Sequence, residues 1–287
     1  GIDEQEKEID AIINNSEPAN FENTIAALDN SGKLLAKVSS VFFNLTSSDT
    51  NDELQKLAQD IAPKMSEHSD NINLNEKLFA RVKKVYEDYS VEGKEKLNLT
   101  TEQKMLLNNT YKNFVRSGAN LTKENQEKLR KLNSELSLLS LKYGDNLLAE
   151  TNAYEMIIEK QEDLAGLPQE IIDAAAVDAK AKNKEGKWLF TLSNSSVMPF
   201  LQYSSKRELR QTLFNAYQKR GNNDNDKDNK ETVRKISNLR MEKAQLLGYK
   251  NHAAYVLEES MAKTPQTVNG LLEKLWIPAL AKAKVEA

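Results

Sequence analysis

The chain has 287 residues, of which 39% are hydrophobic and 29% charged, with a formal net charge of −3. This length suits one large or two medium domains, and the low apolar share favours helices with one wet face over a sheet buried on both sides. The charge gives nucleic acid no general reason to bind, and the absence of cysteine excludes disulfides, thiolate catalysis and Cys-ligated zinc.

Helical patterns dominate, and the clearest one lies at 121–150. Its large side chains recur every three or four residues, at Leu129, Leu132, Leu136, Leu139, Tyr143 and Leu147. That spacing is typical of one face of a helix. Because the stripe is too short for a free coiled coil, it predicts packing on a neighbouring helix.

Short motifs predict where helices begin. Thr50–Glu53 and Thr100–Gln103 have the form of a capping box, in which side chains satisfy the free N–H groups of the first turn. Proline is favoured at the first helical position, so we expect helices to begin at Leu167-Pro168, Met198-Pro199 and Thr264-Pro265.

Glycines predict where helices end. Gly221 and Gly248 indicate that helices at 199–220 and 230–247 stop there. The segment 111–120 places Arg116, Gly118 and Asn120 at the close of another helix. Gly118 is a candidate C-cap, and Asn120 or Thr122 is expected to cap the next helix. Whether this segment faces a groove is open at the level of sequence.

Two segments break the helical pattern. Residues 154–158 and 188–192 alternate large apolar side chains with others, and a helix is predicted between them at 168–182. We therefore expect a mainly α fold, a multi-helix lobe with a small β-hairpin or two-stranded sheet. The polar loop 221–230 is predicted to be the least ordered piece, and 41–45 (Val-Phe-Phe-Asn-Leu) is predicted to lie in the core.

Several kinds of site are excluded by motif. The ten glycines are scattered, which removes phosphate-binding loops and dinucleotide fingerprints, and no Gly-x-Ser-x-Gly elbow occurs. Asp224, Asp226 and Asp228 match the first ligands of a calcium loop, but Asn229 and Lys235 occupy the positions of its glycine and glutamate. A solvated acidic turn is the favoured interpretation.

The chain contains two histidines, His68 and His252. Neither has a second histidine four residues away, so no helix presents the His-Glu-x-x-His pair that holds catalytic zinc. His68 lies among polar residues and is predicted to be on the surface. His252 is expected to open a helix in a capping or packing role. We assign no catalytic residue and no metal ligand, and the substrate-binding residues are unknown.

An ordered set of segments carries a family resemblance. The chain resembles the N-terminal half of peptidyl-dipeptidases, within the thimet oligopeptidase-like zinc metallopeptidases that include oligopeptidase A. The segments are Phe21–Leu28, Ser31–Leu35, Val41–Leu45, Ile61–Lys64, Leu78–Val82, Phe114–Asn120, Leu164–Leu167, Gly186–Trp188, Leu247–His252 and Met261–Pro265.

The resemblance implies a helical enzyme whose two lobes enclose a deep channel. Zinc is held there by the two histidines of His-Glu-x-x-His and a later glutamate, and the motif glutamate acts as general base. The branch removes dipeptides from the C-termini of short peptides. Since the motif is missing, no catalytic residue can be carried over. We expect residues 1–287 to be an N-terminal helical lobe truncated at both ends, inactive alone, with zinc in the full-length protein.

The expected partners are short peptides and the protein's own C-terminal catalytic domain, with no nucleic acid and no membrane. Trp276 and Leu280 are expected to be exposed on the face that meets that domain. The cytoplasm is the favoured compartment and the periplasm stays open, because any signal peptide would precede Gly1. The alternative function is a stand-alone helical protein-interaction module.

Overall fold

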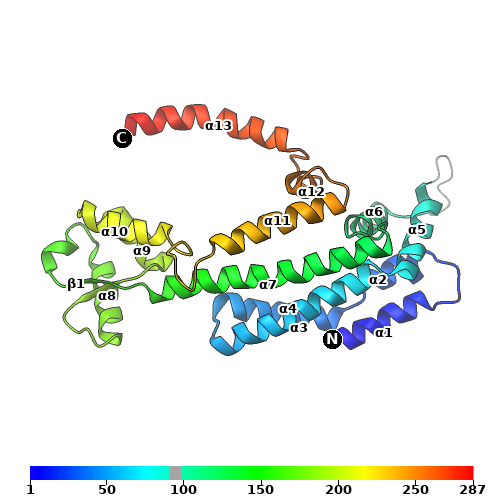
Figure 1. Cartoon of the computed structure of the whole chain (residues 1–287), viewed down its shortest axis with the longest axis horizontal. Helices are drawn as coiled ribbons and strands as arrows, with labels where there is room; N and C mark the ends of the chain where they lie inside the picture. The colour runs from blue at the N-terminus through cyan, green and yellow to red at the C-terminus, as the bar shows by residue number, and fades with distance from the viewer. Residues whose placement is uncertain (91–97, 287) are drawn as a thin grey trace. The chain divides into compact units, whose positions relative to one another are not determined.

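The computed structural model describes residues 1–90 and 98–286, which form two compact units. Unit 1 comprises Gly1–Leu138 and Ser237–Ala287, and unit 2 comprises Leu139–Ile236. Two long helices, α7 (Lys123–Ala153) and α11 (Lys230–Leu246), contribute residues to both units (Figure 1). The stripe predicted at 121–150 therefore lies on a single helix, and the helix predicted at 230–247 is confirmed.

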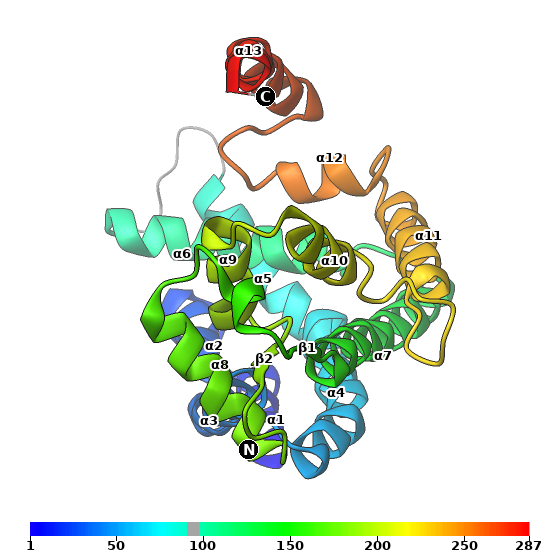
Figure 2. The same ribbon diagram turned by 90° about the vertical axis from the view of Figure 1, so that its left-hand side faces the viewer.

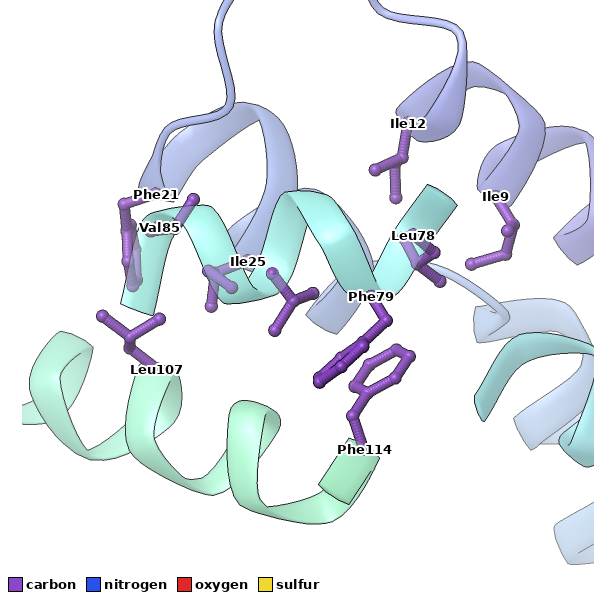
Figure 3. Packing of buried hydrophobic residues seen from close by; sticks show 10 residues of the cluster. Ile9, Ile12, Phe21, Ile25, Leu78, Phe79, Val85, Leu107 and Phe114 are labelled. Carbon is purple, nitrogen blue, oxygen red and sulfur yellow. The ribbon is translucent and has the colours of Figure 1, made fainter. Parts of the chain in front are cut away.

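The described residues of unit 1 form helices joined by turns and loops, without a strand. Besides parts of α7 and α11, it contains α1 (Ile2–Ile13), a π-helical turn η1 (Phe21–Ala26), α2 (Ala27–Asp29), α3 (Lys33–Ser48), α4 (Asp52–Asn73), α5 (Glu76–Ser90), α6 (Thr101–Arg116), α12 (His252–Leu257) and α13 (Pro265–Glu286). Its core is formed by ten buried side chains from α1, η1, α5 and α6 (Figure 3).

Helix α5 explains how that core is built. Leu78, Val82 and Val85 recur at helical spacing and are buried, so one face of α5 is apolar. Phe79 stacks on Phe114 of α6, with ring centroids 5.9 Å apart (Figure 3). The closing residues of α6 are thereby tied to the core of unit 1.

Unit 2 contains the sheet. Its elements are the second part of α7, β1 (Met156–Ile158), a 3-10 helix η2 (Gln161–Leu164), α8 (Gln169–Ala181), β2 (Trp188–Phe190), α9 (Asn194–Tyr203), α10 (Arg207–Gln218) and the first residues of α11. The strands pair antiparallel, with Ile157 opposite Leu189, and α8 packs against β2 (Figure 2). The predicted mainly α fold, the small sheet and the helix at 168–182 are confirmed.

The single helix predicted at 199–220 is wrong. Two helices, α9 and α10, occupy the region, and Pro199 lies inside α9 rather than at its start. The break is a long-range contact, because Ser205 N donates to the carbonyl of Ala165 at 2.7 Å. Gly166 makes this approach possible, since a Cβ there would lie 2.4 Å from the carbonyl oxygen of Tyr203.

Two of the five predicted helix starts are confirmed as made, and two others lie one residue away. Thr100 caps α6 in a capping box with Gln103, and α13 begins at Pro265. At the start of α4 the cap is Asn51, whose side chain accepts from Leu54 N, and not Thr50 as predicted. Helix α8 begins one residue later than expected, with Pro168 as its N-cap.

The prediction that Val41–Leu45 lies in the core is wrong. The apolar residues of α3 form an exposed stripe instead, with Leu34 44%, Val38 57%, Val41 62% and Leu45 46% exposed. No residue of α3 is buried. The stripe has the spacing of a packing face, but no described element covers it.

Candidate functional site

The two histidines lie in different surroundings. His68, on α4, is only 5% exposed, so the predicted surface position is wrong. Its Nε2 lies 2.8 Å from Oε1 of Gln5, and its Nδ1 lies 3.8 Å from a carboxylate oxygen of Glu6. Helix α1 therefore covers a histidine whose sequence neighbours are polar, a contact that local sequence cannot reveal.

His252 is the first residue of α12. The preceding residue, Asn251, caps the helix: its side-chain oxygen accepts a hydrogen bond from Ala254 N at 2.9 Å. Burial lowers the pKa of His252, and the nearby charges of Arg240 and Lys243 lower it further. The predicted helix start at His252 is confirmed, but the cap is Asn251 rather than His252.

These surroundings do not suit zinc. Within residues 1–90 and 98–286, no three His, Asp or Glu side chains form a group able to hold a metal ion. His68 uses one nitrogen on Gln5, and His252 lies among positive charges that disfavour a cation. The metal that the family resemblance implies is therefore not matched by a donor set in this part of the chain.

The segment at the close of α6 carries a cluster of polar contacts in unit 1. The guanidinium of Arg116 is paired with the carboxylate of Glu258 and donates to the carbonyl oxygen of Tyr255 at 2.7 Å. It also lies 4.5 Å from the ring centroid of Tyr255. The hydroxyl of Tyr249 donates to Glu258 at 2.6 Å. The end of α6 thus faces α12 (Figure 1), and the Arg116 cluster joins the two helices.

Replacing Arg116 with lysine is expected to lower the free energy of unfolding by about 1–2 kcal/mol, because an ammonium cannot make the forked contacts of a guanidinium. The ion pair itself adds little, since the Glu258 side chain is 43% exposed. Urea unfolding followed by circular dichroism measures the loss, and hydrogen exchange at 252–257 should accelerate.

Lys112 provides a matched control. It pairs with Glu259 across 2.9 Å, with the two side chains 47% and 41% exposed. Lys112→Gln is expected to cost about 0.5 kcal/mol or less. Equal losses for the Arg116 and Lys112 variants would show that the Arg116 cluster contributes no more than a surface ion pair.

A second polar group links α4, α7 and α11. Asp70 is 6% exposed and accepts from Nδ2 of Asn133 at 2.7 Å, while Oδ1 of Asn133 accepts from Nζ of Lys243 at 2.6 Å. Burial raises the pKa of Asp70 and lowers that of Lys243. This group is not visible in the sequence, because its members are far apart in the chain and each resembles an ordinary residue of a solvent-facing helix surface.

In unit 2, hydrogen bonds hold the loop 221–230 in place, whereas the sequence predicts it to be the least ordered segment. Glu150 of α7 is 9% exposed and accepts from the backbone N–H of Gly221, from Asn223 at 2.9 Å and from Asn225 at 2.7 Å. Burial alone would raise the pKa of Glu150, but these hydrogen bonds outweigh it and lower the pKa. A single carboxylate therefore organises the loop.

The acidic residues of the same loop are paired internally. Nζ of Lys230 lies 2.5 Å from Asp224 and 2.9 Å from Asp228, and this contact lowers the pKa of Asp228 to about 2. The ammonium of Lys230 therefore pairs with two of the carboxylates that a calcium loop would use as ligands. Asp224 and Asp226 are 87% and 80% exposed, as expected for a solvated acidic turn.

Comparison with known proteins gives a consistent family. Residues 200–286 match Peptidase family M3. The chain is 34% identical over 279 residues to the dipeptidyl carboxypeptidase of Escherichia coli K12, a match covering 97% of this chain and 40% of that protein. It is 31% identical over 271 residues to oligopeptidase A of Salmonella typhimurium, covering 93% and 39%. A thimet-like oligopeptidase of Dictyostelium discoideum is 25% identical over 261 residues.

A helical chain with this similarity along nearly its whole length belongs to peptidase family M3. Within the family, the match to a dipeptidyl carboxypeptidase and to oligopeptidase A confirms the predicted branch. The chain spans 40% and 39% of the length of those two relatives, and the matched part is their N-terminal portion.

Proposed function

We propose that the chain is the N-terminal helical lobe of a zinc metallopeptidase that releases dipeptides from the C-termini of short peptides. The 287 residues shape access to the channel and do not themselves break peptide bonds. The observation that carries the proposal is the similarity to a dipeptidyl carboxypeptidase over 97% of this chain. The missing His-Glu-x-x-His motif is why the role is one of binding and steric selection.

Exposed apolar faces support a role beside a second protein surface. Helix α13 leaves Leu272, Trp276 and Ile277 exposed by 56%, 65% and 72%, and the stripe on α3 is exposed as well. Surfaces of this kind are typical of interfaces. We propose that they meet the catalytic domain of the same polypeptide, whose residues would hold the zinc and activate water.

The test begins with the reading frame that contains the codon for Ala287. It should encode His-Glu-x-x-His and a later glutamate. The protein from the whole frame should release C-terminal dipeptides from short peptides, detected by mass spectrometry, and a chelator should abolish the release. The 287-residue chain, assayed in parallel with added zinc, should release nothing. Internal cleavage of a C-terminally amidated peptide would instead assign an oligopeptidase A type of activity.

Two outcomes contradict the proposal. Chelator-sensitive hydrolysis by the 287-residue chain would show that it carries its own zinc site. A reading frame without the zinc motif would favour the second candidate, a helical interaction module, for which the exposed faces of α3 and α13 are the partner surfaces.

In the described residues no helix is long and apolar enough to cross a membrane. The cytoplasmic location stays a prediction.

A further inference from the structure

A pocket of about 470 Å³ lies beside α9 and α10 in unit 2. It is lined by Leu201 of α9 and by Arg207, Arg210, Gln211, Phe214 and Asn215 of α10. This volume falls in the range of pockets that bind small ligands. We call it the Arg207 pocket.

The spacing of α10 separates two faces. Leu209, Leu213 and Ala216 pack in the core cluster of unit 2. Arg207, Arg210, Gln211 and Phe214 follow at positions i, i+3, i+4 and i+7, and all four line the pocket. One face of the helix therefore holds unit 2 together, while the other gathers two guanidinium groups and an aromatic ring in one place.

The charge of the pocket is unbalanced. No Asp or Glu lines it, and within the described residues the guanidinium of Arg207 has no ion-pair or hydrogen-bond partner. The guanidinium of Arg210 is oriented by donating to the carbonyl oxygen of Ser204. The neighbouring Lys206 is used elsewhere, on Asp163 at 3.2 Å. The pocket thus presents one free and one oriented guanidinium.

An apolar wall lies beside these cations. Phe214 is 48% exposed, although it follows the fully buried Leu213, and Leu201 faces it from α9. A guanidinium binds carboxylates through paired hydrogen bonds, and an exposed aromatic ring offers apolar contact area. Gln211 and Asn215 add amide groups able to bond a peptide backbone.

We propose that the Arg207 pocket binds the C-terminal end of a short peptide. Arg207 and Arg210 receive the terminal carboxylate, while Phe214 and Leu201 contact an apolar side chain of the last residues. That the ligand is a peptide rests on the proposed function. The preference for a carboxylate next to an apolar group rests on the pocket alone.

The test is a titration of the 287-residue chain with a fluorescein-labelled tetrapeptide ending in Phe-Leu, followed by fluorescence anisotropy. The same peptide with a C-terminal amide should bind at least about tenfold more weakly, because it lacks the negative charge of the carboxylate. Arg207→Gln should weaken binding of the free acid to a similar extent and leave the amide nearly unchanged. Raising the salt concentration should weaken the acid alone.

Control variants separate binding from folding. Lys219→Gln removes a positive charge at the residue that directly follows α10, outside the pocket, and this variant should bind as the original chain does. Phe214→Ala should weaken both peptide forms, and circular dichroism verifies that each variant is folded. Equal affinity for acid and amide, or wild-type binding by Arg207→Gln, overturns the proposal. Displacement of the peptide by equal concentrations of inorganic phosphate also overturns it, since the pocket would then be a general anion site.

This outcome is independent of peptide hydrolysis. If the chain binds neither peptide form, the Arg207 pocket is not a peptide site, yet the full reading frame can still release dipeptides under a chelator-sensitive assay. If hydrolysis fails while acid and amide are distinguished, the pocket stands and the proposed enzyme does not.

Discussion

Replacing Phe200 with alanine is expected to lower the free energy of unfolding of unit 2 by about 3–5 kcal/mol. Phe200 is fully buried, and its ring lies 4.6 Å from that of Phe190 in an edge-to-face contact. The substitution removes a large apolar surface and leaves a cavity between α9 and β2. Since β2 is one of only two paired strands in unit 2 as described, the sheet should loosen together with α9.

Tryptophan fluorescence makes the measurement specific to unit 2. The chain has two tryptophans: Trp188 packs against the core of unit 2, whereas Trp276 is 65% exposed. In a Trp276→Phe background, urea unfolding reports Trp188 alone. Phe214→Ala is the matched control, because this phenylalanine of the adjacent helix is 48% exposed. If both substitutions lower stability equally, Phe200 is not part of a packed core.

The second large effect is expected for Glu150→Gln, which should lower stability by about 1.5–3 kcal/mol. The glutamine is nearly the same size, but it presents fewer acceptor positions and no charge to the three donors of the loop 221–230. Hydrogen exchange at 221–229 should increase with it. Glu135→Gln, an exposed position on the same helix, should change stability by about 0.5 kcal/mol or less.

The pH dependence of this effect has a definite sign. The pKa of Glu150 is held below its ordinary value of 4.5 in the folded chain. The ionised carboxylate therefore stabilises the fold above pH 4.5, and this contribution is lost as the pH falls through the folded pKa. The stability difference between the original chain and Glu150→Gln should be constant near neutral pH and shrink in acid. A difference that persists unchanged in acid would assign the effect to shape rather than charge.

Local patterns were sufficient where an element depends on its own residues. Thr100 and Gln103 satisfy each other's N–H groups within one turn. The start of α6 can therefore be predicted from the four residues 100–103. The helix at 168–182 and the strands at 156–158 and 188–190 follow from side-chain periodicity. The absence of a paired-histidine zinc motif is likewise a matter of spacing along the chain.

Long-range contacts explain the errors. His68 is buried because α1 packs against α4 and covers it. The helix predicted at 199–220 breaks because the backbone N–H of Ser205 donates to the carbonyl of Ala165. The face of α3 that contains Val41 has the pattern of a core helix but no described partner. Periodicity identifies an apolar face, but it does not identify what covers that face.

The sequence by itself determined the helical class, the small sheet, the family and the absence of the zinc motif, because each depends on residue type and spacing. The tertiary structure decided which polar residues act together. Arg116 meets Glu258, Glu150 holds the loop that begins at Gly221, and Arg207 shares a pocket with Phe214. Hydrogen bonds and pockets depend on distances of a few ångströms between side chains, and those distances are set only when helices distant in the chain pack together.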